Sequence, residues 1–227
     1  MFTNEATSRI IGILSDSFFP ILKAGLYFTI PLSIIAFILG TLLAFFTAIV
    51  RISNIKPLIV LAKFYVWIFR GTPLLVQLFI LFYGLPNLGI TLNPFPAAVI
   101  GFTLNVGAYS SEIFRASILS IQKGQWEAAF SIGMTKSQAM RRIILPQAMR
   151  VSLPPLGNSF ISLVKDTSLA ATITVTEMFQ KSQQIVAATY EPLWLYVEVA
   201  FIYLIFSTVL SFGQSLLERR YDRTVAK

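Results

Sequence analysis

The stretch GLYFTIPLSIIAFILGTLLAFFTAIV, residues 25–50, has no charged residue over 26 positions. An α-helix rises about 1.5 Å per residue, so this stretch is long enough to cross the ~30 Å of hydrocarbon in a bilayer. The rest of the chain has a matching composition: 56% of its 227 residues are hydrophobic, 12% are charged, and the mean hydropathy is +0.73. The sequence therefore predicts an all-α integral membrane protein.

Four further apolar stretches follow the first one. We expect a transmembrane domain over residues 25–217, and its five spans cover about 25–50, 57–84, 95–119, 151–175 and 193–217. The second span is interrupted by Arg70-Gly-Thr-Pro73, where glycine and proline favour a break in the helix. Residues 1–24 are expected to form an N-terminal interfacial segment, because 8–22 is short and only half apolar. Residues 176–192 are expected to form a mixed polar loop.

The basic residues predict how the chain is oriented. Three segments, 51–56, 120–150 and the tail 218–227, hold eleven basic residues: Arg51, Lys56, Lys123, Lys136, Arg141, Arg142, Arg150, Arg219, Arg220, Arg223 and Lys227. The opposite loops hold only Arg9, Lys23 and Lys181. Because basic loops stay in the cytoplasm, we expect the N-terminus outside and the C-terminus inside. The net charge of +8 is thus a mark of topology and does not indicate nucleic-acid binding.

Residues 120–150 are too long and too patterned for a plain connector. They predict a first short helix over 125–132, ended by Gly133, and a second helix that Thr135 and Gln138 open as a capping box. The second helix is expected to end at Pro146. Such a cytoplasmic helix pair can lie on lipid phosphates through Arg141 and Arg142, or it can dock into a groove on a soluble partner.

The residue identities in this loop resemble the EAA loop of bacterial ABC importer permeases. The matching pattern is Glu127-Ala-Ala129, Gly133 and Ile143-Ile-Leu-Pro146. The resemblance implies a coupling surface for a partner ATPase, formed by Glu127, Ala128, Ala129, Gly133, Arg141, Leu145 and Pro146. It also implies that ATP and Mg bind to that partner, and that this chain holds no cofactor, no metal and no catalytic residue.

Four further motifs look like the polar amino acid uptake subfamily of these permeases. They are Arg70-Gly-Thr-Pro-Leu-Leu-Val-Gln77, Asn105-Val-Gly-Ala-Tyr-Ser-Ser-Glu-Ile-Phe-Arg115, Leu156-Gly-Asn158 and Lys165-Asp-Thr-Ser-Leu169. The resemblance implies a type I importer in a bacterial cell membrane. Its partners would be a second, identical permease, an ATPase dimer and an extracytoplasmic solute-binding protein.

Polar and charged residues within the spans predict a substrate site, because isolated charge is expensive in lipid. The candidates are Arg70, Gly71, Thr72, Pro73, Leu74, Asn105, Tyr109, Glu112, Ser159, Asp166 and Thr167. Arg70 can attract a carboxylate, Asp166 can accept an ammonium, and the helix break can expose backbone groups. Each also has a structural interpretation: Arg70 can snorkel to the interface, Glu112 can pair with Arg115, and Lys165-Asp166 can form an ion pair or a dimer contact.

The substrate prediction rests on two details. Arginine- and histidine-type permeases of this subfamily commonly have an acidic residue directly after Leu-Gly-Asn, whereas this chain has Ser159. Residues 173–194 look most like the L-cystine permeases. We therefore expect L-cystine, with glutamine, arginine or histidine as alternatives. An ion-driven carrier and a membrane enzyme are disfavoured, because no internal repeat is seen and the chain lacks histidine and cysteine.

Overall fold

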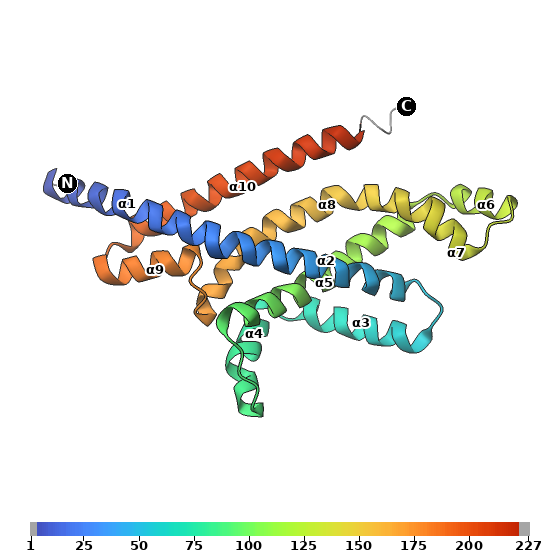
Figure 1. The fold of residues 1–227 in the computed structure, drawn as a ribbon, viewed down its shortest axis with the longest axis horizontal. Coiled ribbons are helices and arrows are strands. Elements are labelled where there is room, and N and C mark those ends of the chain that lie inside the picture. The colour runs from blue at the N-terminus through green and yellow to red at the C-terminus, as the bar shows by residue number, and fades with distance from the viewer. Residues whose placement is uncertain (1–3, 223–227) are drawn as a thin grey trace. The chain divides into compact units, whose positions relative to one another are not determined.

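A computed structural model describes residues 4–222, and every regular element in this range is helical (Figure 1). In chain order the elements are α1 Asn4–Ala24, η1 Gly25–Thr29, α2 Ile30–Arg51, α3 Lys56–Gly71, α4 Leu74–Phe79, η2 Ile80–Gly84, η3 Leu85–Leu88, α5 Pro94–Ser120, α6 Lys123–Ser131, α7 Lys136–Ala139, η4 Met140–Ile144, α8 Leu145–Asp166, η5 Thr167–Ile173, α9 Met178–Thr189 and α10 Pro192–Asp222. The all-α prediction is confirmed. Arg223 and Lys227 of the basic tail lie outside the described residues.

Within residues 4–222, two helices are long and apolar enough to cross a membrane, Glu5–Arg51 and Pro192–Arg219. The pair formed by α3 and the segment 74–88 qualifies only when it is counted as one broken span. Helices α5 and α8 have 27 and 22 residues, which is sufficient length, but neither is apolar enough to count among these spans. The total of five spans therefore stays a prediction.

The N-terminal segment that we expected at the membrane interface is helical and runs directly into the first span. Helix α1 continues through the single π-turn η1 into α2, so the helix is unbroken from residue 5 to residue 51. Ile21 of α1 is fully buried in a cluster with Met178, Val199 and Ile202 of α9 and α10. The segment therefore packs against two other helices, and its place at the membrane interface stays a prediction.

The chain forms two compact units. One contains Met1–Ala36, Leu74–Phe102 and Ile161–Ser211; the other contains Phe37–Pro73, Thr103–Phe160 and Phe212–Lys227. We call them the first and the second unit. In the first unit α9 lies against α1, and the two helices enclose the cluster around Ile21 (Figure 1).

The second unit packs its helices through small residues. Ala44 and Ala48 of α2 are fully buried against Phe114 of α5 and Leu156 of α8. Lipid is as apolar as leucine, so helices in a membrane associate through close contact rather than through hydrophobic burial. The large apolar residues of α2, such as Leu42 and Phe46, are accordingly exposed.

The expected polar loop at 176–192 is wrong, because the structure has a twelve-residue helix, α9, in its place. Glu177 begins this helix: its carboxylate accepts hydrogen bonds from the backbone N–H groups of Phe179 and Gln180, at 2.9 and 2.8 Å. The hydroxyl of Tyr203 donates a third bond to the same carboxylate, at 2.6 Å. An acidic N-cap followed by a helix was therefore present in the sequence.

The hairpin between α5 and α8 has the predicted start and turn, but its second helix does not end at Pro146. Thr135 and Gln138 form the reciprocal capping box, and Gly133 has a left-handed backbone with φ +79°. Before the proline, the N–H of Leu145 donates to the carbonyl of Met140, five residues back. This π-turn, η4, shifts the bonding pattern ahead of a residue that has no N–H, and the helix continues as α8.

Candidate functional site

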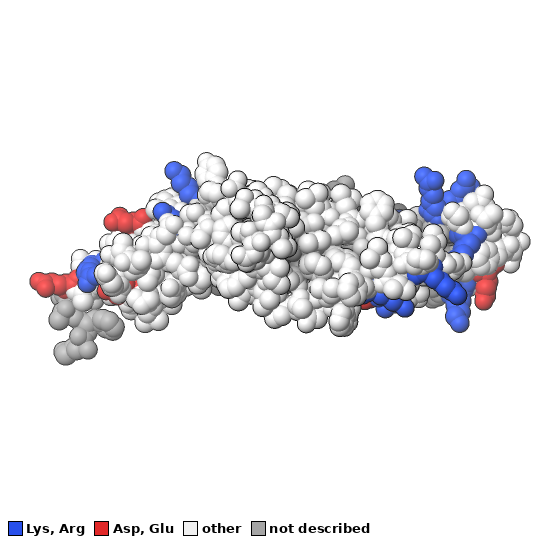
Figure 2. Space-filling model, turned by 90° about the horizontal axis from the view of Figure 1, so that it is seen from below, with Lys and Arg blue, Asp and Glu red and all other residues white. Residues whose placement is uncertain are grey.

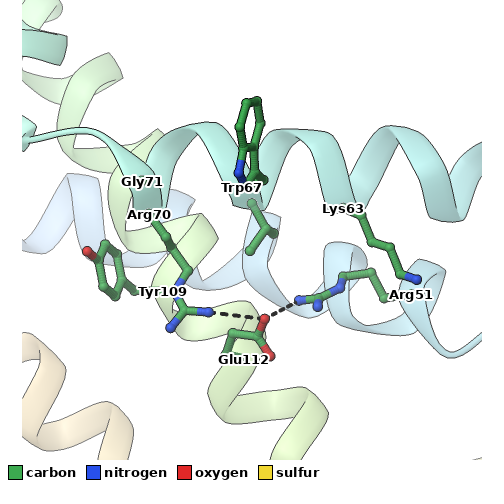
Figure 3. Close-up of a pocket in the computed structure, with 8 residues that line it drawn as sticks. Arg51, Lys63, Trp67, Arg70, Gly71, Tyr109 and Glu112 are labelled. Atoms are coloured by element: carbon green, nitrogen blue, oxygen red, sulfur yellow. Dashed lines mark hydrogen bonds and ion pairs between the residues drawn. The ribbon is translucent and has the colours of Figure 1, made fainter.

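The second unit has an open pocket of about 400 Å³, which we call the cavity (Figure 3). Its walls come from the end of α2, the last two turns of α3 and the second half of α5. The residues that line it are Arg51, Lys63, Val66, Trp67, Arg70, Gly71, Tyr109 and Glu112. Four of the predicted substrate residues therefore meet in one place: Arg70, Gly71, Tyr109 and Glu112.

Glu112 lies at the centre of an ion cluster that joins three helices. Its Oε1 accepts from Nη1 of Arg51 at 2.8 Å and lies 3.2 Å from Nη1 of Arg70. Its Oε2 accepts from Nε of Arg115 at 2.9 Å. Figure 3 shows Arg51 and Arg70 reaching this carboxylate from opposite sides. One carboxylate thus fixes the position of three guanidinium groups.

Arg70 is also held by an aromatic ring. Its guanidinium carbon lies 5.4 Å from the centroid of the Tyr109 ring, within range of a cation–π contact. Trp67, one turn earlier on α3, is 71% exposed, and its ring points away from Glu112 (Figure 3). Tyr109 therefore restrains Arg70, while Trp67 lies at the rim of the cavity.

The charge in this cavity is unbalanced. Arg51, Lys63 and Arg70 bring three positive charges to a space that holds a single carboxylate. No ion pair among the described residues involves Lys63, and Nε of Arg51 is buried without a hydrogen-bond partner within the same residues. An open pocket with excess positive charge attracts anions, carboxylates among them.

The other predicted substrate residues lie elsewhere. Thr72 follows Gly71 in extended backbone, and its hydroxyl donates to the carbonyl of Ile68 at 2.9 Å. Pro73 ends the break, and Leu74 begins α4 in the first unit. Asn105 is half-buried one turn before Tyr109 on α5, and Ser159 is half-buried on α8.

Asp166 and Thr167 belong to the first unit. Asp166 is exposed at the end of α8, whereas Thr167 is fully buried and its hydroxyl donates to the carbonyl of Val164 at 2.7 Å. The alternative in which Glu112 pairs with Arg115 is confirmed. An ion pair between Lys165 and Asp166 is not among those formed by residues 4–222.

Sequence reasoning missed two cations of the cavity. The sequence pattern marks Arg51 only as a topological charge at the end of the first span, and it assigns no role to Lys63. A signal was nevertheless available, because Lys63, Trp67 and Arg70 are separated by four and three residues and so share one helix face. Arg51 carried no comparable signal, since its partner Glu112 is 61 residues away.

The hairpin α6–α7 forms a second candidate surface in the same unit. Ala129 is fully buried, while Glu127, Ala128, Gly133, Arg141 and Pro146 are exposed and Leu145 is half-buried. Phe130 and Ile132, which were not predicted as site residues, are 48% and 73% exposed. Figure 2 shows Lys and Arg side chains gathered at the hairpin end of this unit. The exposed basic residues there are Lys123, Lys136, Arg141, Arg142 and Arg150.

The membrane-length helices, the charged cavity and the basic hairpin fit the class of transport permeases, and the comparison with known families assigns the chain to that class. A family model described as "Binding-protein-dependent transport system inner membrane component" matches residues 40–223, and the chain belongs to this family. It is a transport subunit and not an enzyme.

Individual relatives are similar over the whole length. The L-cystine transport system permease protein TcyB of Bacillus subtilis (strain 168) is 54% identical, and the alignment covers 100% of both chains. The probable glutamine ABC transporter permease protein GlnM of the same organism is 38% identical over 94% of this chain and 99% of its own. A crystal structure of an amino acid ABC transporter with histidines has a TM-score of 0.82 at 34% identity, covering 97% and 99% of the two chains.

Proposed function

We propose that this chain is the permease subunit of an ABC importer whose substrate is L-cystine. The coarser statement, a permease of an amino-acid ABC importer, follows from the family and from the relatives named above. The assignment of L-cystine as the substrate rests on the full-length identity of 54% to an L-cystine permease. The lower similarity to a glutamine permease makes glutamine the second candidate.

The cavity supports a substrate rich in carboxylates. L-cystine has two α-carboxylates and two ammonium groups, whereas arginine has one carboxylate and a net positive charge. A space lined by Arg51, Lys63 and Arg70 with one carboxylate attracts carboxylates and repels the guanidinium of arginine, whereas L-cystine brings two carboxylates and no net positive charge. We assign the cavity to the substrate, with Arg70 as its carboxylate ligand and Glu112 as the group that positions Arg70. We assign contacts at other points of the substrate's path through the membrane to four further residues: Asn105, Ser159, Asp166 and Thr167.

The hairpin supports coupling to an ATPase. Exposed Phe130 and Ile132 provide an apolar tip, and the surrounding lysines and arginines provide a basic rim. The turn between α6 and α7 is fixed by Gly133 and by the capping box, so a push from a partner moves the hairpin as one body. We assign Glu127, Ala128, Ala129, Gly133, Arg141, Leu145 and Pro146 to this contact, with ATP and Mg held by the partner.

The assembly that we propose contains two identical permeases, an ATPase dimer and an extracytoplasmic binding protein in a bacterial cell membrane. The N-terminus faces outside and the C-terminus faces the cytoplasm, which the basic hairpin supports. Alternating access then moves the substrate without any bond chemistry.

Competitive uptake tests the substrate. The complex is reconstituted in liposomes with ATP enclosed inside and the binding protein outside. Labelled L-cystine then competes with unlabelled cystine, glutamine, arginine and histidine. We expect cystine to compete best and uptake to stop without ATP. Uptake that continues without an ATPase would indicate an ion-driven carrier. Stronger competition by glutamine than by cystine would make this a glutamine permease.

Lys63→Gln tests the cavity. Removal of one of the three positive charges that line the cavity should weaken its attraction for a carboxylate and raise the half-saturating cystine concentration about tenfold, which corresponds to roughly 1.4 kcal/mol. Lys56→Gln is the matched control, because Lys56 lies on the same helix but does not line the cavity. Equal uptake by both variants would mean that the substrate binds elsewhere.

A further inference from the structure

The turn between α9 and α10 carries a tyrosine that its local structure does not require. Tyr190 ends α9 with φ +60° and ψ 30°, a left-handed conformation that favours glycine or asparagine. Its backbone N–H donates to the carbonyl of Val186 at 2.8 Å, a bond that any residue except proline can make. Its side chain is 83% exposed, so the ring packs against almost nothing. Neither the helix end nor the core accounts for a tyrosine here.

The turn is held firmly in place. Nη2 of Arg9 on α1 donates to the carbonyl of Thr189 at 3.1 Å and lies 3.6 Å from Oε1 of Glu191. Pro192 then begins α10 directly. Helix α9 itself is anchored by Met178, which is fully buried among residues of α1 and α10. A rigid base under an exposed aromatic ring is what an anchor residue at a protein interface needs, because little side-chain entropy is lost on binding.

The surface around Tyr190 allows a close approach. The exposed residues on the preceding two turns of α9 are Gln183, Gln184, Ala187 and Ala188, which are small or neutral. Arg9 is 62% exposed beside them and keeps donors that the turn does not use. A partner that fits this surface presents an apolar pocket for the ring and an acidic residue for Arg9.

We propose that Tyr190 is the anchor through which this permease contacts its extracytoplasmic solute-binding protein. The proposal rests on the proposed function, in particular on the orientation that places residues 176–192 opposite the basic hairpin. The partner follows from the family, whose description names dependence on a binding protein.

The test uses the complete complex of permeases and ATPases in nanodiscs. The ATPase rate is measured against the concentration of the cystine-loaded binding protein that stimulates the wild-type complex. Tyr190→Gly should leave the rate without binding protein unchanged and raise the half-maximal concentration about tenfold or more, as expected when an aromatic anchor is removed. Tyr190→Phe, which keeps the ring, should stay within about threefold.

Thr174→Gly is the matched control. Thr174 is also exposed, lies in the same unit and has φ +64°, so the change to glycine relieves the same kind of backbone strain without removing a ring. It should leave the half-maximal concentration unchanged. The proposal is overturned if Tyr190→Gly does not change that concentration, or if both glycine variants change it equally.

The proposal is also overturned if Tyr190 faces lipid. In that case Tyr190→Gly would lower the thermal stability in nanodiscs and leave the half-maximal concentration of binding protein unchanged. Failure of every binding protein to stimulate the wild-type complex would reject the proposed function as well. Stimulation of the wild type with a normal response of Tyr190→Gly would reject only the anchor.

Discussion

Glu112 is the residue whose loss should cost the second unit most. Its carboxylate is 23% exposed and compensates Arg51, which is 12% exposed, together with Arg70 and Arg115. Glu112→Gln leaves three neighbouring guanidinium groups without a counter-charge. We expect the free energy of unfolding to fall by roughly 2–3 kcal/mol, less than for a fully buried pair because water reaches part of the cluster. Denaturation in mixed micelles measures this loss.

Arg115→Gln is the control for that variant. Arg115 is 37% exposed, and Glu112 keeps Arg51 and Arg70 when it is removed. The expected loss is about 0.5–1 kcal/mol. If Arg115→Gln costs as much as Glu112→Gln, the three arginines do not share one carboxylate as the distances indicate.

Among the residues of the cavity, some were predictable from the sequence and others were not, for physical reasons. Arg70 and Glu112 were recognisable because charge inside an apolar span is expensive. Their meeting with Arg51 depends on which faces of α2, α3 and α5 pack together, and no short-range pattern encodes that. The exposed tip residues Phe130 and Ile132 were missed because an apolar residue on a short helix is usually buried.

At the scale of elements, the contact between α3 and α5 depends on Gly107. A Cβ added there would lie 2.6 Å from the hydroxyl oxygen of Tyr65 and 2.8 Å from Cδ2 of Leu43. The same hydroxyl donates to the carbonyl of Leu104 at 2.6 Å, which ties α3 to α5 beside the cavity. Gly107→Ala should therefore destabilise the protein by about 1–3 kcal/mol through overpacking.

Gly213→Ala provides the comparison, since a Cβ at Gly213 would have nothing within 4 Å. That change should stabilise α10 by up to about 1 kcal/mol through helix propensity alone. Thermal midpoints in nanodiscs should move in opposite directions for the two variants. A neutral Gly107→Ala would show that α3 can move away from α5 at no cost.

The hairpin depends on a second glycine. At φ +79° an L side chain is strained, so Gly133→Ala should cost about 1 kcal/mol and tilt α6 against α7. We expect less ATPase to copurify with this variant while membrane insertion is retained. Gly124→Ala on α6, where a Cβ would meet nothing within 4 Å, should copurify normally. Normal copurification of both variants would separate the hairpin from the ATPase contact.

Element boundaries were predictable where composition and capping agreed. The capping box at Thr135 and the glycine before it were confirmed, because both depend on neighbours within three residues. The end at Pro146 was wrong, since a π-turn two residues earlier accommodates the proline. Helix α9 was missed because its polar face resembles a loop, whereas its buried face is defined by α1 and α10, which are distant in sequence.

At the scale of the whole molecule, the proposed mechanism requires that the basic hairpin and the Tyr190 turn face opposite sides of the membrane. The positive-inside bias predicts this arrangement, and the absence of cysteine from the sequence makes it directly measurable. Gln183→Cys on α9 and Ser137→Cys on α7 each place one thiol at an exposed position. A membrane-impermeant maleimide should label Gln183→Cys on intact cells and Ser137→Cys only after the membrane is opened.

These two variants control for each other, because the reagent and the membrane are the same and only the side differs. Labelling of both variants after permeabilisation shows that each thiol is accessible. The absence of labelling in the cysteine-free parent shows that the signal comes from the introduced residue. If Ser137→Cys reacts on intact cells, α6 and α7 lie outside, where no ATP-hydrolysing partner can reach them. The cavity would then lack its source of energy, and the chain would have to work as a carrier driven by something other than ATP.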